Sequence, residues 1–462
     1  MVQGAVAGQA NMVPEQMAEG GQPQAIRERP VTARGIDGCR MRPDSWQREV
    51  VPWARARLLR RRRALFCTDI PEEETIMKES KTTYGFETQC VHGAVNRSWQ
   101  DGERSVVTPL YQTAAFAHVE VGHGQFNYTR QDNPTRLHLE ETVAALEGSE
   151  TAVAFASGMA AIAAVFELFR PGDHIIVSED LYGGTTRLFN NISRKNGLLV
   201  DFVDTTDPKK LRAAVRPETR AIYVETPTNP MMNVTDLRLA RAAANQTGAL
   251  LIVDNTFLTP CFQRPLSLGA DVVVHSGTKY LAGHNDTISG FVVTADRALG
   301  EDIRLIGKTT GGMLSPFDSF LTERGIKTLH VRMERAQETA LFLAKALRDN
   351  PRVRQVYYVG LPEHPGYAVN KAQTTGSGAM LSFRVDSPET AVRVLKGVRL
   401  ITFAESLGGT ETLITYPLTQ THDSVPEAQR LHLGIDGTLL RLSVGLEKAE
   451  DLLADLQQAL GE

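Results

Sequence analysis

Short runs of branched and apolar residues recur through the middle of this 462-residue chain, and they restrict the folds that it can adopt. Stretches with helical spacing, such as 236–246, separate the runs. Because buried strands that alternate with helices pair in parallel, the pattern predicts an α/β layer sandwich with a mostly parallel sheet. The strands that we predict for this sheet cover 199–203, 221–224, 250–253, 272–274 and 291–293.

Polar residues follow three of these predicted strands directly. The segments 225–230, 254–256 and 276–279 each begin where an apolar run ends. Ligands of open α/β sheets bind outside the carboxyl ends of the strands, so we expect a binding site there. The chain contains neither a Gly-x-Gly-x-x-Gly fingerprint nor a Walker loop, which removes the central feature of a dinucleotide or nucleotide site.

Lys279 ends one of these polar segments, directly after a valine-rich run. An amine that attacks a carbonyl group must be unprotonated, and burial beside positive charge lowers a lysine pKa enough to allow this. Ser276 and Thr278 supply hydroxyl groups suited to phosphate oxygens, and Asp254 supplies the carboxylate that keeps a pyridine nitrogen protonated. Together they predict pyridoxal phosphate held as a Schiff base. The alternative is a solvated loop lysine and a turn-forming aspartate.

A second anion site is predicted at Ser157, Gly158 and Met159. These residues open a stretch, 160–169, of small and apolar residues that reads as a buried helix. Free backbone amides and the helix dipole both favour an anion at such a position. A Ser-Gly helix start alone is weak support for this site.

The segment Ser-Gly-Thr-Lys-Tyr-Leu-Ala-Gly-His at 276–284 resembles the pyridoxal-lysine segment of the Cys/Met-metabolism, or trans-sulfuration, enzymes. The resemblance extends from about residue 84 to the C-terminus, with several motifs in the family order. It implies the PLP-dependent transferase fold, fold type I, with a smaller C-terminal α/β domain. It also implies pyridoxal 5'-phosphate as the cofactor and a homodimer or homotetramer as the assembly.

The same resemblance assigns roles to residues elsewhere in the chain. Tyr128 and Arg130 are expected to grip the cofactor phosphate of a neighbouring subunit, and Tyr182 to stack on the pyridine ring and share the catalytic role with Lys279. Arg441 is expected to hold the substrate α-carboxylate, because a planar guanidinium can donate two parallel hydrogen bonds. The remaining substrate-binding residues implied by the resemblance are Arg187, Asn229, Glu405 and Ser406.

Three positions depart from the family patterns. Gln131-Asp132 stands where many members carry a small or basic residue and then glycine, which leaves the local substrate contact open. Gly184 occupies the place of the cysteine usual in methionine lyases, which counts against that activity. Gln420 replaces the methionine of the usual Met-Thr-His, so no role is carried over to it.

Composition changes sharply near residue 77. Residues 1–76 hold 12 arginines and no lysine, whereas all 12 lysines lie beyond. We expect 1–76 to be a disordered, dispensable leader; a nucleic-acid or membrane arm and a transit peptide are the alternatives.

Three parts are expected after this leader. They are an N-terminal arm at 77–145 that contacts a neighbouring subunit, a large PLP-binding domain at 146–330 and a substrate domain at 331–462. A long helix at 324–348 is expected to bridge the last two, with a strand at 380–385 and a closing helix marked by leucines at 452–460.

Charge and cysteine content add further expectations. The 50 basic and 54 acidic residues imply no polyanionic partner, so no nucleic acid is expected. The four cysteines are widely scattered, which indicates neither a disulfide framework nor a metal site. No apolar run approaches the roughly 20 residues of a membrane span, and no signal peptide opens the chain. A cytoplasmic protein is expected.

The function implied by the resemblance is that of a trans-sulfuration enzyme closest to cystathionine γ-synthase, which exchanges the acyl group of O-acylhomoserine for cysteine. Cystathionine γ-lyase and O-acylhomoserine sulfhydrylase are the alternatives within this chemistry. A degenerate enzyme acting as a binding module is the alternative of another class. The intact set of Lys279, Asp254 and Arg441 speaks against degeneracy.

Overall fold

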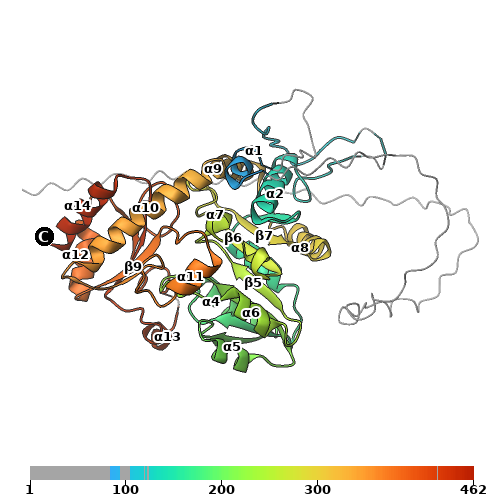
Figure 1. The fold of residues 1–462 in the computed structure, drawn as a ribbon. Helices are drawn as coiled ribbons and strands as arrows, with labels where there is room; N and C mark the ends of the chain where they lie inside the picture. Colours follow the sequence, from blue (N-terminus) through green and yellow to red (C-terminus); the bar gives the residue numbers. More distant parts are fainter. Residues whose placement is uncertain (1–83, 94–104, 119, 122–123, 424, 462) are drawn as a thin grey trace, which may run out of the picture. The chain divides into compact units, whose positions relative to one another are not determined.

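The computed structural model describes residues 84–93, 105–118, 120–121, 124–423 and 425–461. The leader predicted at 1–76 lies outside these residues. Two sheets organise the described part, one of seven strands and one of five (Figure 1).

The seven-stranded sheet has the order β1-β7-β6-β5-β4-β2-β3. Adjacent strands from β6 to β3 all run parallel, whereas β7 is antiparallel to both β1 and β6. The prediction of a mostly parallel sheet is therefore confirmed. The strands are β1 (Ala152–Phe155), β2 (His174–Ser178), β3 (Leu199–Val203), β4 (Thr219–Glu225), β5 (Leu250–Asp254), β6 (Val272–Ser276) and β7 (Gly290–Thr294).

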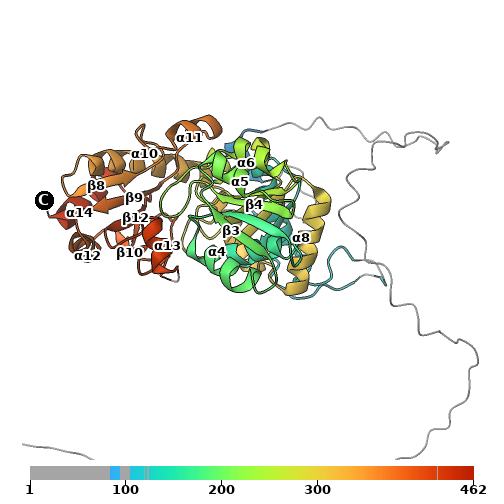
Figure 2. The same ribbon diagram turned by 90° about the horizontal axis from the view of Figure 1, so that it is seen from below.

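Both faces of this sheet are covered by helices, because successive side chains of each buried strand point to opposite faces. In β4, Ile222 and Val224 join a core with α2 and α6, whereas Ala221 and Tyr223 join a second core with α3 and α8. Figure 2 shows α5 and α6 beside β3 and β4. The helices of this part are α1 (Phe86–His92), α2 (Pro134–Glu147), α3 (Gly158–Phe166), α4 (Gly183–Leu188), α5 (Pro208–Ala214), α6 (Leu237–Ala244), α7 (Thr259–Phe262), α8 (Arg297–Thr310) and α9 (Pro316–Ile326), with a π-helix at Phe189–Ser193 and a 3-10 helix at Pro265–Leu268.

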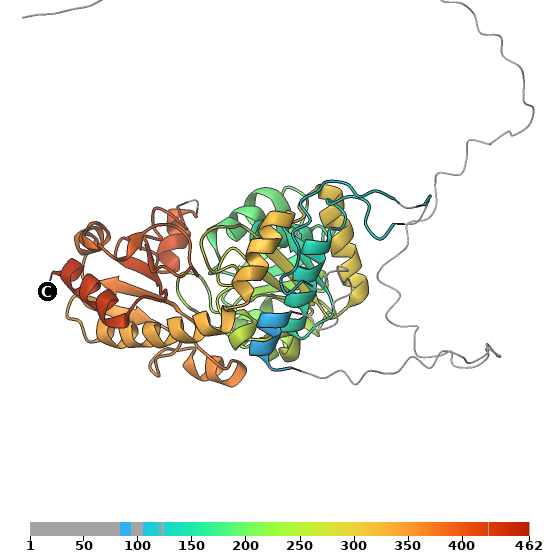
Figure 3. The same cartoon turned by 90° about the horizontal axis from the view of Figure 1, so that it is seen from above.

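The five-stranded sheet has the order β10-β11-β12-β9-β8 and is mostly antiparallel, with β10 and β11 as its parallel pair. α10 packs on β8, β9 and α14 and also contacts α1 and α7, so it joins the two sheet regions. Figure 3 shows this orange helix running from blue α1 toward the red C-terminal helices. The elements are α10 (Leu329–Arg348), β8 (Val353–Tyr357), α11 (Tyr367–Gln373), β9 (Met380–Val385), α12 (Pro388–Gly397), β10 (Thr402–Phe403), β11 (Leu413–Thr415), α13 (Glu427–His432), β12 (Leu439–Ser443) and α14 (Ala449–Leu460).

Three predicted helices have different bounds in the structure. The helix expected at 236–246 is α6, which is slightly shorter at both ends. The single helix expected at 324–348 is wrong at its start, because α9 ends at Ile326 and α10 begins at Leu329. Between them, the Thr328 hydroxyl donates to the Gly325 carbonyl at 3.2 Å, a local bond that competes with continuous helix. The helix expected at 160–169 is α3, which starts at Gly158 and stops at Phe166. None of the described helices is long and apolar enough to span a membrane.

Candidate active site

A cavity of about 250 Å³ lies at the carboxyl ends of β4, β5 and β6, beside the start of α3. Residues from the C-terminal region complete its wall. The predicted site residues in this wall are Ser157, Gly158, Met159, Tyr182, Asn229, Asp254, Ser276, Thr278, Lys279, Glu405, Ser406 and Arg441. Tyr128, Arg130 and Arg187 are predicted site residues that do not line it.

Lys279 follows β6 and reaches the cavity from the end of the seven-stranded sheet. Its amine donates a hydrogen bond of 2.9 Å to the Ser406 hydroxyl. Burial, followed by the positive charge of Arg441, lowers the pKa of Lys279 to about 8, and Glu405 partly opposes this. An amine with this pKa is unprotonated in an appreciable fraction of molecules near neutral pH, as a nucleophile or proton carrier requires.

Asp254 ends β5 and is held by three donors. The Thr256 amide and hydroxyl donate to one carboxylate oxygen at 3.0 and 2.5 Å, and the Tyr223 hydroxyl donates to the other at 3.1 Å. Burial raises the pKa of Asp254, while the bonds from Thr256 lower it. A buried carboxylate in this state favours a cationic partner, such as a protonated ring nitrogen.

The start of α3 is suited to binding an anion. Ser157 caps the helix by accepting from the Ala160 amide at 3.1 Å, which leaves its hydroxyl hydrogen for another acceptor. A Cβ atom on Gly158 would lie 2.8 Å from the Ser276 Cβ, so glycine permits the helix start to approach the end of β6 closely. The Thr278 hydroxyl is already used, since it donates to the Ser289 carbonyl at 3.1 Å.

Tyr182 precedes α4 and lines the cavity from the side of β2. A Cβ atom on Gly184 would lie 2.5 Å from the Tyr182 ring, so a larger residue at 184 would displace that ring. Burial, followed by the charge of Glu405, raises the pKa of Tyr182. Arg187 lies on the exposed side of α4, outside the cavity wall, although its charge still acts on Tyr182.

Arg441 on β12 is buried in the cavity wall opposite the sheet. Its guanidinium donates to the Asn229 side-chain oxygen at 2.8 Å, to the Ser406 carbonyl at 2.9 Å and to the Thr415 hydroxyl at 3.0 Å. Its Nε atom has no hydrogen-bond partner among the described residues. Burial lowers the pKa of Arg441 to about 10. A buried guanidinium with an unused donor suits a carboxylate ligand.

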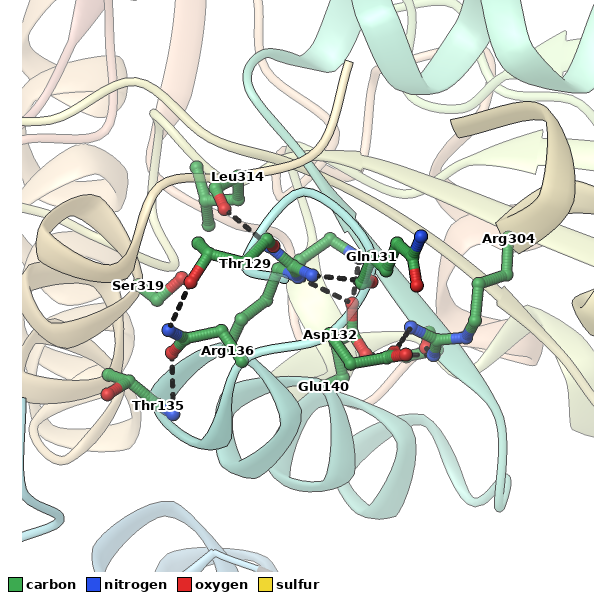
Figure 4. Close-up of polar contacts among 12 residues, drawn as sticks. Thr129, Gln131, Asp132, Thr135, Arg136, Glu140, Arg304, Leu314 and Ser319 are labelled. Carbon is green, nitrogen blue, oxygen red and sulfur yellow. Dashed lines mark hydrogen bonds and ion pairs between the residues drawn. The ribbon is translucent and has the colours of Figure 1, made fainter. Parts of the chain in front are cut away.

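Tyr128 and Arg130 belong to a turn around Thr129 and Gln131. Figure 4 shows the side chain of buried Arg136 bonded to this turn. Arg136 donates to the Thr129 and Leu314 carbonyls at 2.8 and 3.0 Å, and to the Gln131 carbonyl at 2.7 Å. Tyr128 is 43% exposed, and Arg130 donates to the Lys308 carbonyl. The turn is therefore fixed from inside, while the two predicted site residues lie away from the cavity of their own chain.

Several residues of the wall were not among the predicted site residues. Glu225, Thr256, Phe257, Ile288, Leu407 and Thr421 line the cavity as well. Glu225 could have been found, because it is a carboxylate that directly follows a buried strand, as Asp254 is. Thr421 could not have been found from the sequence, because it lies on a loop whose path the sequence does not reveal. Its carbonyl oxygen packs against Gly183, where a Cβ atom would come within 2.0 Å.

The residues of the cavity fit pyridoxal phosphate. The start of α3, whose free amides favour an anion, the buried carboxylate of Asp254, which suits a cationic nitrogen, and Lys279, whose pKa is lowered, all line this cavity. Among the described residues no group of three or more His, Cys, Asp or Glu side chains is arranged to hold a metal ion.

Comparison with known proteins agrees with this chemistry. A family model described as Cys/Met metabolism PLP-dependent enzyme matches residues 87–461. Cystathionine γ-lyase of Bacillus subtilis (strain 168) is 47% identical over 374 residues, which cover 81% of this chain and 98% of that protein. Cystathionine γ-synthase of Haemophilus influenzae is 46% identical over 368 residues, covering 79% and 95%. The crystal structure of cystathionine γ-synthase from Xanthomonas oryzae pv. oryzae in complex with cystathionine superposes with a TM-score of 0.80 at 42% identity, covering 82% and 98%.

Proposed function

This chain belongs to the Cys/Met metabolism family of PLP-dependent enzymes, and we propose that it acts on O-acylhomoserine and cysteine as a cystathionine γ-synthase. In this γ-replacement the acyl group leaves as a carboxylic acid, and the thiol sulfur takes its place on the γ-carbon. The broader class is established by the family: a PLP-dependent trans-sulfuration enzyme that forms or cleaves C–S bonds. One observation carries the proposal, namely that Lys279, Arg441 and Glu405 line the same cavity.

Bound pyridoxal phosphate supplies an electron sink that acidifies the hydrogens near the substrate's amino group. Asp254 would pair with the ring nitrogen, and Tyr182 would cover one face of the ring. The Lys279 amine, with its pKa lowered to about 8, would then remove the Cα proton and move protons at Cβ. The phosphate would be held by Ser157, Gly158, Met159 and Ser276, and Thr278 would join them only by giving up its hydroxyl bond to the Ser289 carbonyl.

Substrate orientation would come from the wall opposite the sheet. Arg441 would donate to the α-carboxylate, with Asn229 and Ser406 fixing its guanidinium through the bonds described above. Glu405 is exposed at the cavity wall, where its carboxylate would accept from the distal ammonium of cysteine or cystathionine. Arg187, on the exposed side of α4, would act only at the outer edge of this substrate path.

The working enzyme would be a homo-oligomer, because Tyr128 and Arg130 lie outside the cavity of their own chain. A turn held by buried Arg136 and presenting an exposed tyrosine is suited to reach a neighbouring subunit. In that arrangement these two residues would bind the phosphate of the neighbour's cofactor.

Cystathionine γ-lyase is the second candidate, favoured by the 47% identity to a relative of that name. A third candidate, O-acylhomoserine sulfhydrylase, would use sulfide in place of cysteine.

The test is a substrate panel with the purified holoenzyme. It would pair O-acetylhomoserine or O-succinylhomoserine with cysteine or sulfide, and would offer cystathionine and methionine alone. We expect the highest kcat/KM for an O-acylhomoserine with cysteine. Preferential cleavage of cystathionine would establish the lyase instead, and a preference for sulfide would establish the sulfhydrylase.

A further inference from the structure

Glu225 lines the cavity, yet it has no role in the proposed mechanism. It is the last residue of β4, and strand register places it directly opposite Asp254, the last residue of β5. Side chains at paired positions of neighbouring parallel strands point to the same face of the sheet, so both carboxyl groups face the cavity. Glu225 is 5% exposed.

The carboxyl group of Glu225 accepts from the main chain of two site residues. The Tyr182 amide donates to Oε2 at 3.1 Å, and the Asn229 amide also donates to this group. Tyr182 comes from the loop after β2, and Asn229 from the loop after β4. Glu225 therefore ties together two loops that reach the cavity from different strands.

The bonds continue from Asn229 to the other wall of the cavity. Arg441 donates to the Asn229 side chain at 2.8 Å and to the Ser406 carbonyl at 2.9 Å, and Lys279 donates to the Ser406 hydroxyl at 2.9 Å. Glu225 is thus one end of a bonded path that reaches the reactive amine.

Two buried carboxyl groups at paired strand positions each disfavour the ionised form of the other, and their hydrogen-bond partners influence which one keeps the charge. Asp254 accepts from Tyr223 and from both donors of Thr256. Among the described residues, Glu225 accepts from main-chain amides alone, and these bonds favour its ionised form. Burial, then the charge of Asp254, outweighs them and raises the pKa of Glu225 well above the usual range. The negative charge of Asp180 also raises the pKa of Glu225, and Tyr182 and Tyr223 face Glu225 as well. Arg441 is the cation that acts against protonation of Glu225.

We propose that Glu225 is a positioning residue whose neutral, protonated carboxyl group fixes the Tyr182 and Asn229 main chain around the cofactor ring. Asp254 is then left as the anion that would pair with the ring nitrogen. This inference rests on the proposed function, because it assigns Glu225 to the same cofactor site. A second fixed negative charge at this place would compete with Asp254 for the ring's proton, and a missing carboxyl group would release Tyr182.

The protonation state is tested by infrared spectroscopy of the holoenzyme at pH 7, with and without 13C-labelled glutamate. We expect a protonated-carboxyl band that shifts with the label and is absent from Glu225→Gln. A labelled difference spectrum in which Glu225 contributes only ionised carboxylate bands would overturn the proposal. This readout does not depend on turnover.

The positioning role is tested by three replacements of differing length and charge. Glu225→Gln retains the length and the acceptor oxygen, Glu225→Asp retains the acid but is one methylene shorter, and Glu225→Ala removes both. We expect the kcat of Glu225→Gln to be at least about tenfold higher than that of Glu225→Ala or Glu225→Asp. The loss of one hydrogen bond corresponds to about a tenfold fall in rate. The visible circular dichroism of the bound cofactor, which reports its contact with Tyr182, should change in the same order.

Other rankings contradict the proposal. If Glu225→Gln lowered kcat as much as Glu225→Ala, the charge and not the position of the carboxyl group would matter. If Glu225→Asp retained as much kcat as Glu225→Gln, the length of the side chain that reaches Tyr182 would not matter. Failure of the proposed function would give a different result. In that case Lys279→Ala would keep both the cofactor absorbance and the turnover, whatever the ranking of the Glu225 variants.

Discussion

The Lys279 amine and the Ser406 hydroxyl, 2.9 Å apart, join the two sheet regions of the chain. Lys279 follows β6 of the seven-stranded sheet, whereas Ser406 lies between β10 and β11 of the five-stranded sheet. Ser406 has a φ of 134°, a value that non-glycine residues rarely adopt and that costs of order 1–3 kcal/mol. The fold maintains this conformation where the hydroxyl meets the Lys279 amine, so the cavity wall depends on both regions being in place.

Replacing Lys279 with alanine should abolish the visible absorbance of the covalently held cofactor. Turnover should fall by at least about a hundred- to ten-thousandfold, the usual worth of a positioned proton-transfer group. Absorbance spectra and initial rates check this, with borohydride treatment of the unmodified enzyme as a second assay for covalent attachment. Lys345→Ala, on the exposed side of α10, is the matched control. Full activity in Lys279→Ala would end the functional proposal.

The pH dependence of cofactor capture should follow the Lys279 pKa. Because the charged amine cannot attack, the rate at which cofactor-free protein captures pyridoxal phosphate should rise with pH through about 8, and not through the ordinary value of 10.5. Arg441→Met removes a positive charge that lowers this pKa, so the midpoint should move upward. Burial is the larger cause, so the shift should stop short of 10.5. An unchanged midpoint in Arg441→Met would exclude this electrostatic coupling.

Arg136→Met should destabilise the protein by about 3–5 kcal/mol, the usual cost of breaking a buried ion pair, here the one that Arg136 forms with Glu140 at 3.7 Å. The change leaves the Thr129, Gln131 and Leu314 carbonyls without their donor. Urea unfolding of the cofactor-free protein measures this loss in the free energy of unfolding. Arg297→Met on α8, whose side chain is 88% exposed, should alter the same quantity by no more than about 0.5 kcal/mol. Equal effects of the two changes would show that Arg136 does not hold the turn.

Much of the large sheet could be predicted because its strands are apolar runs bounded by polar residues. β1 was missed, since Ala152–Phe155 is rich in alanine and reads equally well as the start of a helix. The division between α9 and α10 was missed too, because the apolar spacing continues across Thr328 and the competing hydroxyl bond is a tertiary detail.

The candidate site divides in a similar way. Asp254 and Lys279 follow from local chemistry at strand ends, whereas Tyr128, Tyr182 and Arg441 were assigned only through the family resemblance. Glu225 has the same sequence context as Asp254, but its importance depends on which strands are neighbours. Strand order and register are set by packing over long distances, so one sequence does not reveal that these two carboxyl groups face each other.

Subunit mixing should reveal whether Arg130 serves a neighbouring site. Lys279→Ala and Arg130→Ala proteins should each be nearly inactive, and mixing them under conditions that exchange subunits should restore part of the activity. In a mixed dimer one site carries both lesions and the other carries neither. Light scattering and a tagged-subunit pull-down establish the exchange. If activity does not return despite exchange, Arg130 acts in its own subunit or only supports the turn through its bond to the Lys308 carbonyl.

Glu405→Ala should distinguish an amino-acid thiol from sulfide. Glu405 lines the cavity and is exposed there, so its carboxylate can meet the distal ammonium group of cysteine, which sulfide lacks. A lost hydrogen bond to a charged group costs about 1.5–3 kcal/mol, so kcat/KM for cysteine should fall by about one to two orders of magnitude. The rate with sulfide should change far less. Glu411→Ala, which removes a carboxylate bonded to Asn285, is a control on the same loop. Equal losses with cysteine and sulfide would mean that Glu405 does not read the amino-acid thiol, and would favour the sulfhydrylase.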